Sequence, residues 1–167
     1  MAKTLKIKFI KVKKIEIIYK IYNFINNQMS LLLSSKPDKW KIRKIVSVLQ
    51  DELDDVSLQK DKYDYDEDFG MCVSLITKSH LLKNILEVFT IFKTLGVTEL
   101  PLEVKQYILA RCKIIKKRLT IHTVQLRKFK AYNLEENINY FNLYLRIIYS
   151  YTLTGKFVQP NIEFRRN

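Results

Sequence analysis

The chain contains very little glycine and proline. Three of each occur in 167 residues, and the glycines Gly70, Gly96 and Gly155 stand far apart. A β fold with many turns needs more of both residues, whereas long uninterrupted helices need few. The same scarcity excludes the usual glycine-rich phosphate-binding loops, which need glycines close together. We therefore expect an all-α fold, a bundle of about four to five helices with a short extended C-terminal segment.

Cysteine and histidine are equally scarce. Cys72 and Cys112 have neither CxxC spacing nor a histidine at ligand spacing, which argues against a disulfide framework or a zinc site. His80 and His122 have no acid or nucleophile nearby, so a hydrogen-bonded interior or surface role is favoured for both over catalysis. The acid-rich residues 51–68 lack the register of a calcium-binding loop. We expect no catalytic residue, no metal site and no cofactor, so the chain is predicted not to be an enzyme.

Long apolar runs are also missing. Residues 1–20 interleave lysines with apolar side chains, so they lack the unbroken apolar stretch of a secretory signal peptide. Residues 21–35 form the longest uncharged run, which is too short and too rich in amide side chains to cross a bilayer. The sequence therefore predicts neither secretion nor a membrane span.

Charge and apolar patterning divide the chain into a basic extension 1–28, a helical domain 29–155 with an acidic loop 59–69, and an extended tail 156–167. The extension has no arginine and one acid, Glu16, and matches a mitochondrial transit peptide only in part. Met29 is an alternative start, which would leave the extension untranslated or unstructured. The tail is expected to be extended because Ile162 and Phe164 alternate with polar and charged neighbours after Pro160.

Apolar residues at helical spacing predict four main helices. The first follows Pro37 with Asp38 as its cap, and the second runs from a capping Ser79 to Gly96. The second has so many apolar positions that we expect it to be the central helix. The third starts at Val104 and the fourth runs from Asn133 to near Gly155. The apolar stripe of the third comprises Val104, Ile108, Cys112, Ile115, Leu119, His122, Leu126 and Phe129. The short apolar run 71–76 fits a helix or a strand equally well.

The third of these helices is strongly basic outside its apolar stripe. Lys and Arg outnumber Asp and Glu by 30 to 17 in the chain, and no acid occurs between Glu103 and Glu135. The candidate face for an anionic partner comprises Lys113, Lys116, Lys117, Arg118, Arg127 and Lys128. Such a face binds nucleic acid when its cations meet phosphates, with Tyr107 or Tyr132 stacking on bases. The alternative is a solvated basic surface on a helix of the bundle.

Aromatic residues crowd the fourth predicted helix. The cluster comprises Tyr140, Phe141, Tyr144, Tyr149 and Tyr151. These are more aromatic residues than one helix face can bury, and tyrosine is favoured in interfaces where one end of the side chain stays wet. We therefore expect some of them to contact a partner.

Several stretches of the last half of the chain carry a family resemblance. They are the residues 81–87 (LLKNILE), 116–121 (KKRLTI), the pair Glu135-Glu136 with Tyr140-Phe141-Asn142, Tyr144 and Arg146, and the residues 160–165 (PNIEFR). Together they resemble the helical A domain of the GINS complex subunit family, most nearly that of its PSF-one subunit, and the start of the small β domain. Residues 1–28 have no counterpart in that family, and the acidic loop is an insertion.

The resemblance implies a non-catalytic subunit of a nuclear, four-part scaffold of the DNA replication machinery. Its partners would be the other subunits of a GINS-like tetramer, the MCM replicative helicase and the CDC-forty-five protein. The subunit interface it implies comprises Tyr140, Phe141, Tyr144 and Arg146.

Two other classes of function fit the residues. A basic, helix-rich chain suits an RNA-binding component of an organellar ribosome, which would place it in the mitochondrion. It also suits a viral helical-bundle protein that binds host factors, which could act in the cytoplasm.

Overall fold

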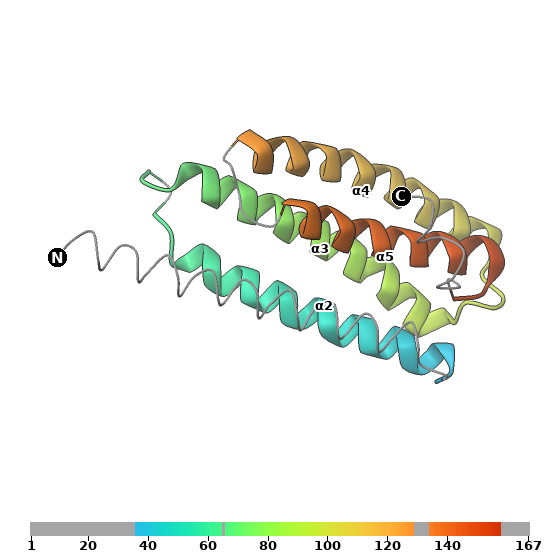
Figure 1. Cartoon of the computed structure of the whole chain (residues 1–167). Helices are drawn as coiled ribbons and strands as arrows, with labels where there is room; N and C mark the ends of the chain where they lie inside the picture. The colour runs from blue at the N-terminus through green and yellow to red at the C-terminus, as the bar shows by residue number, and fades with distance from the viewer. Residues whose placement is uncertain (1–35, 65, 129–133, 158–167) are drawn as a thin grey trace. The chain divides into compact units, whose positions relative to one another are not determined.

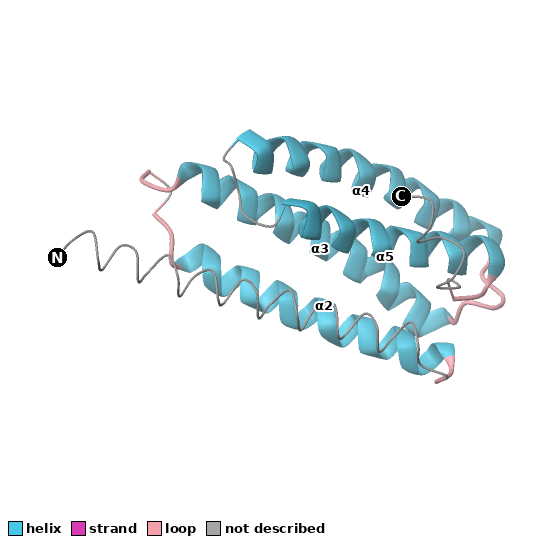
Figure 2. Cartoon of the chain, viewed as in Figure 1, coloured by secondary structure: helices cyan, strands magenta, loops and turns pink. Residues whose placement is uncertain are grey.

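Four α-helices make up the described part of the chain (Figure 1). The structure is a computed structural model that describes residues 36–64, 66–128 and 134–157, with the helical backbone at 125–126 and 134–137 given without side chains. The helices are α2 (Asp38–Asp61), α3 (Phe69–Leu95), α4 (Leu102–Lys128) and α5 (Leu134–Thr154). None of the described residues forms a strand (Figure 2), so the all-α prediction is confirmed. The predicted extension 1–28 lies outside the described residues, as does the tail beyond Phe157.

Each helix runs antiparallel to the one before it, which gives an up-down-up-down bundle (Figure 1). Helix α3 packs against α2, α4 and α5, and α5 packs against both α3 and α4. Helix α3 is therefore buried on several sides. Its fully buried residues include Leu81, Leu82, Ile85, Val88 and Phe89. The prediction that this helix is central is therefore confirmed.

Helix α2 begins differently from the prediction. Pro37 occupies the capping position, and its carbonyl oxygen accepts hydrogen bonds from the amides of Trp40 (3.0 Å) and Lys41 (3.2 Å). Asp38 lies in the first turn and makes no capping hydrogen bond. Its Oδ1 instead accepts a hydrogen bond from the Tyr151 hydroxyl at 3.2 Å, so the aspartate joins α2 to α5.

Helix α3 begins at Phe69, well before the predicted start at Ser79. Cys72, Leu75, Ser79 and Leu82 follow one another in steps of three and four residues and are all buried, so they form one continuous face. Ser79 is 3% exposed in the middle of that face and does not cap the helix. The unassigned run 71–76 is helical, and the predicted acidic loop 59–69 loses residues at both ends, because α2 extends to Asp61 and α3 begins at Phe69.

Two glycines end helices where the sequence predicts. Gly96 and Gly155 have φ angles of 76° and 69°, in the left-handed region that disfavours other residues. Their amides donate to the carbonyl oxygens of Phe92 (2.9 Å) and Tyr151 (3.0 Å). A Cβ atom at Gly155 would also lie 3.2 Å from the Val97 carbonyl oxygen, so this glycine lets the end of α5 approach the α3–α4 loop.

Aromatic rings fill the interior between α3, α4 and α5. Phe89 and Tyr144 meet edge to face with centroids 5.8 Å apart, and Phe92 meets Tyr151 at 5.5 Å. Tyr144 also contacts Tyr140, with centroids 5.0 Å apart. Edge-to-face pairs add about 0.5–1.5 kcal/mol each beyond the burial of apolar area. This aromatic cluster therefore ties α5 to the central helix.

Candidate functional site

Helix α4 has a buried apolar seam on one side and a basic surface on its outer side. Ile108, Cys112, Ile115, Leu119 and His122 are at most 7% exposed and face the bundle. Pro101 precedes the helix, and its carbonyl oxygen accepts a hydrogen bond from the Lys105 amide at 3.0 Å. The predicted apolar stripe is confirmed for these residues, whereas its last predicted member, Phe129, lies outside the described residues.

The six residues predicted to face an anionic partner all have exposed side chains. They are Lys113, Lys116, Lys117, Arg118, Arg127 and Lys128. Lys116 places its Nζ 4.8 Å from the centroid of the Tyr149 ring on α5, a cation–π contact at the edge of the α4–α5 interface. The others extend the basic surface around the outer side of α4. The structure thus presents these cations to solvent.

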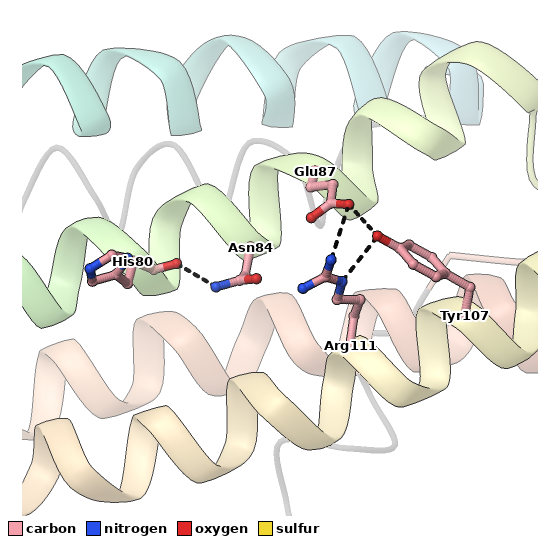
Figure 3. Close-up of polar contacts among 5 residues, drawn as sticks. All are labelled: His80, Asn84, Glu87, Tyr107 and Arg111. Carbon is pink, nitrogen blue, oxygen red and sulfur yellow. Dashed lines mark hydrogen bonds and ion pairs between the residues drawn. The ribbon is translucent and has the colours of Figure 1, made fainter.

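A polar network links the start of α4 to α3 (Figure 3). The Tyr107 hydroxyl donates a hydrogen bond to Glu87 Oε1 and accepts one from Arg111 Nε at 3.0 Å. Arg111 also lies 3.8 Å from the Glu87 carboxylate, and its guanidinium stands 5.2 Å from the centre of the Tyr107 ring. The hydrogen bond to Tyr107, followed by the charge of Glu87, raises the pKa of Arg111 above its usual value.

This network orients Tyr107, one of the two residues predicted to stack on bases. Arg111 lies over one side of the ring and Glu87 accepts the hydrogen bond of the hydroxyl, so these contacts orient a side chain that is still 41% exposed. Tyr132, the other predicted stacking residue, lies outside the described residues. On the neighbouring turns of α3, Asn84 donates to the carbonyl oxygen of His80 at 2.8 Å, and the His80 side chain is exposed (Figure 3).

The predicted aromatic interface lies mainly inside the bundle. Tyr140, Phe141 and Tyr144 are 8%, 0% and 2% exposed, and Arg146 is half-buried. The expectation that these three rings face a partner is corrected, because α5 packs against two helices and buries more than one face. Burial raises the pKa values of the Tyr140 and Tyr144 hydroxyls well above their usual range.

His122 and Cys112 are interior groups. His122 is 1% exposed, and neither ring nitrogen has a hydrogen-bond partner among the described residues. Burial, assisted by the charge of Lys78, lowers the pKa of His122 to about 4, so the ring is neutral at physiological pH. Burial raises the pKa of the Cys112 thiol to about 11, which keeps it protonated and unreactive.

Sequence reasoning missed a second apolar stripe on α4, which is exposed. Ile114, Ile121 and Val124 are 40%, 47% and 59% exposed on the side away from the buried seam. The signal was present as a seven-residue spacing from Tyr107 to Ile114 to Ile121, but the surrounding lysines made this side look entirely polar.

No group of three or more His, Cys, Asp or Glu side chains suited to a metal ion occurs in residues 36–64, 66–128 and 134–157. Within the same residues no helix has the length and apolar character needed to cross a membrane.

Comparisons of the chain with models of known protein families, with characterised protein sequences and with solved structures found no match. The class of protein is therefore defined by its described fold, an antiparallel four-helix bundle that carries a basic and partly apolar outer surface on one helix.

Proposed function

We propose that the chain is a non-catalytic binding subunit of a multiprotein assembly, and that this assembly is a GINS-like component of the DNA replication machinery in the nucleus. The observation that carries the first step is the outer side of α4, where Ile114, Ile121 and Val124 are exposed among cations. Apolar side chains grouped on a surface are typical of protein interaction sites, and lysines and arginines beside them favour an acidic partner.

The family resemblance supports the second step. Its residues on α3 and α5 include Leu81, Ile85 and Phe141, which belong to the core and suit the same kind of helical bundle. Its stretch 116–121 includes Lys116, Lys117 and Arg118, which are exposed beside the apolar residues of α4. The resemblance thus extends from the interior of the bundle to the surface proposed to bind a partner.

An RNA-binding role is the second candidate, and the exposed lysines of α4 favour it. The two candidates differ in what the exposed isoleucines contribute. A phosphate backbone gains little from apolar side chains, whereas a protein interface is stabilised by their burial.

The test is purification of the tagged full chain from its own cells, with and without nuclease treatment, followed by mass spectrometry. The proposal predicts nuclease-resistant recovery of GINS-like subunits together with the MCM helicase. Ribosomal proteins and RNA that are lost on nuclease treatment would replace it with the ribosomal role. Recovery of host proteins unrelated to replication would replace it with the viral one.

A variant that removes three cations of α4 tests whether the assembly binds at this surface. The triple substitution Lys113→Gln, Lys117→Gln and Arg118→Gln should reduce recovery of the partners. Its control is the substitution of three exposed cations of α2, Lys39→Gln, Arg43→Gln and Lys44→Gln, which removes the same charge elsewhere. Equal recovery with both variants would show that α4 does not contact the assembly.

A further inference from the structure

The exposed apolar residues of α4 follow a coiled-coil pattern. Tyr107, Ile114 and Ile121 are seven residues apart, and Ala110 and Val124 follow the first and last of them by three residues. At about 100° per residue these positions fall on one side of the helix, opposite the buried seam. All five side chains are exposed. From Tyr107 to Val124 the stripe is about 25 Å long, enough to contact several turns of another helix.

A cation interrupts this stripe. Lys117 lies between Ile114 and Ile121 at the position that Ala110 and Val124 hold in the neighbouring repeats. Lys113 and Arg118 flank it, and all three cations are exposed. None of the three pairs with a carboxylate in the part of the chain that the structure describes. A helix docked on the isoleucines would cover the Lys117 ammonium, which is costly without an opposite charge.

We propose that this stripe is the docking site for an acidic amphipathic helix of a partner protein. The partner places apolar side chains at seven-residue spacing against Ile114, Ile121 and Val124, and its carboxylates pair with Lys113, Lys117 and Arg118. The inference rests on the proposed function as a binding subunit and specifies the chemistry of one partner. The interaction is a helix-on-helix contact in which apolar burial supplies affinity and charge sets the choice of partner.

The geometry disfavours a second copy of this chain as the occupant. Two α4 stripes in contact would bring the Lys113, Lys117 and Arg118 side chains of both copies together. Like charges at such an interface oppose association, and the described residues of α4 contain one acid, Glu103, at its start. Nucleic acid is also disfavoured, because Ile114, Ile121 and Val124 are exposed in the stripe and a phosphate backbone gains little from apolar side chains.

The test measures binding of synthetic helices to the purified full chain by fluorescence anisotropy. The probe has about 20 residues, with leucines at seven-residue spacing and glutamates beside them, and spans about 30 Å as a helix. One control peptide has the same composition in scrambled order, and another carries lysine in place of glutamate. The probe should bind, and both controls should bind at least about tenfold more weakly.

Two variants separate the contributions of the surface. Ile114→Gln with Ile121→Gln should weaken probe binding by about tenfold or more, and the Lys113, Lys117 and Arg118 triple should weaken it by a similar factor. The apolar control is Leu58→Gln with Leu153→Gln, which are 63% and 66% exposed on other helices. The cation control is the α2 triple described above. Circular dichroism checks that every variant folds.

Several results would overturn the inference. Equal binding of the scrambled peptide would mean that charge alone attracts the probe. Equal loss in the variants and their controls would place binding elsewhere on the molecule. The alternative partner is an RNA duplex. Nucleic acid would be the partner if RNA binding weakens in the Lys113, Lys117 and Arg118 triple and is unchanged in the Ile114 and Ile121 variant.

Recovery of the cellular assembly distinguishes this inference from the proposed function. If the isoleucine variant still recovers the complete assembly, the docking site is wrong and the function stands. If the unmodified chain recovers no protein assembly, the function itself fails.

Discussion

A neutral histidine enclosed in the core makes the stability of this bundle depend on pH. His122 packs against Phe141, with ring centroids 6.1 Å apart, and its nitrogens find no hydrogen-bond partner among the described residues. The charged group described nearby is Lys78 on α3, whose Nζ pairs with Glu52 of α2 at 3.0 Å. A second positive charge beside this lysine is unfavourable, and burial adds to that cost.

His122 is predicted to make the folded state less stable in mild acid. The pKa is 6.5 when the ring is solvated and about 4 when it is buried, so the unfolded chain binds the proton first as pH falls. The free energy of unfolding should therefore decrease by up to about 1.4 kcal/mol per pH unit through this window, roughly 3 kcal/mol in all. Above pH 6.5 this contribution is constant.

Urea unfolding between about pH 7.5 and about pH 4 measures this effect against His122→Leu, which cannot titrate. The difference in stability between the two proteins should change across the window, with the leucine variant gaining as pH falls. Parallel stability curves would contradict the assignment of a buried, neutral ring.

At the scale of the helices, α5 has a structural role where the sequence indicated a binding one. Phe141→Ala should lower the free energy of unfolding by about 3–5 kcal/mol, because it leaves a cavity among the rings of α4 and α5. Leu153→Ala, on the exposed side of the same helix, should change it by less than about 0.5 kcal/mol. Thermal unfolding measures both, and equal effects would show that α5 is not packed as described.

Parts of three helices could be predicted from local sequence patterns. The buried seam of α4 was predictable from the spacing of its apolar residues. The ends of α3 and α5 were predictable from Gly96 and Gly155, because glycine readily adopts the positive φ angles that end helices. The burial of Tyr140 and Tyr144 was not predictable, because it depends on how many neighbours surround α5. The start of α3 was missed because buried Ser79 looked like a cap.

The candidate site was predicted in part for a similar reason. The lysines of α4 were identified from composition, since charged side chains on a helix with one apolar seam face solvent. The exposed Ile114 and Ile121 were not identified, because an apolar residue is expected to be buried until its neighbours are known. The pairing of Tyr107 with Glu87 depends on the alignment of α3 with α4, which no local pattern encodes.

At the scale of the whole molecule, the cysteines report on opening of the bundle. Cys112 is 0% exposed with a raised thiol pKa, and Cys72 is 6% exposed near the α2–α3 loop, where its Sγ lies 3.9 Å from the Tyr63 carbonyl oxygen. Both should resist iodoacetamide in the native protein, and Cys112 should be the slower to react. Mass spectrometry of labelled peptides in increasing urea measures this. Rapid labelling of Cys112 in the absence of denaturant would contradict the packing.

The contact between Asp38 and Tyr151 has a consequence for the order of folding. The two residues are 113 positions apart, whereas the α2–α3, α3–α4 and α4–α5 pairs form between neighbours in sequence. Closing so long a loop is entropically costly until those hairpins have formed, so this hydrogen bond belongs to the last step of assembly. Tyr151→Phe, which removes only the donor hydroxyl, should therefore leave the refolding rate nearly unchanged and accelerate unfolding, which stopped-flow kinetics can resolve.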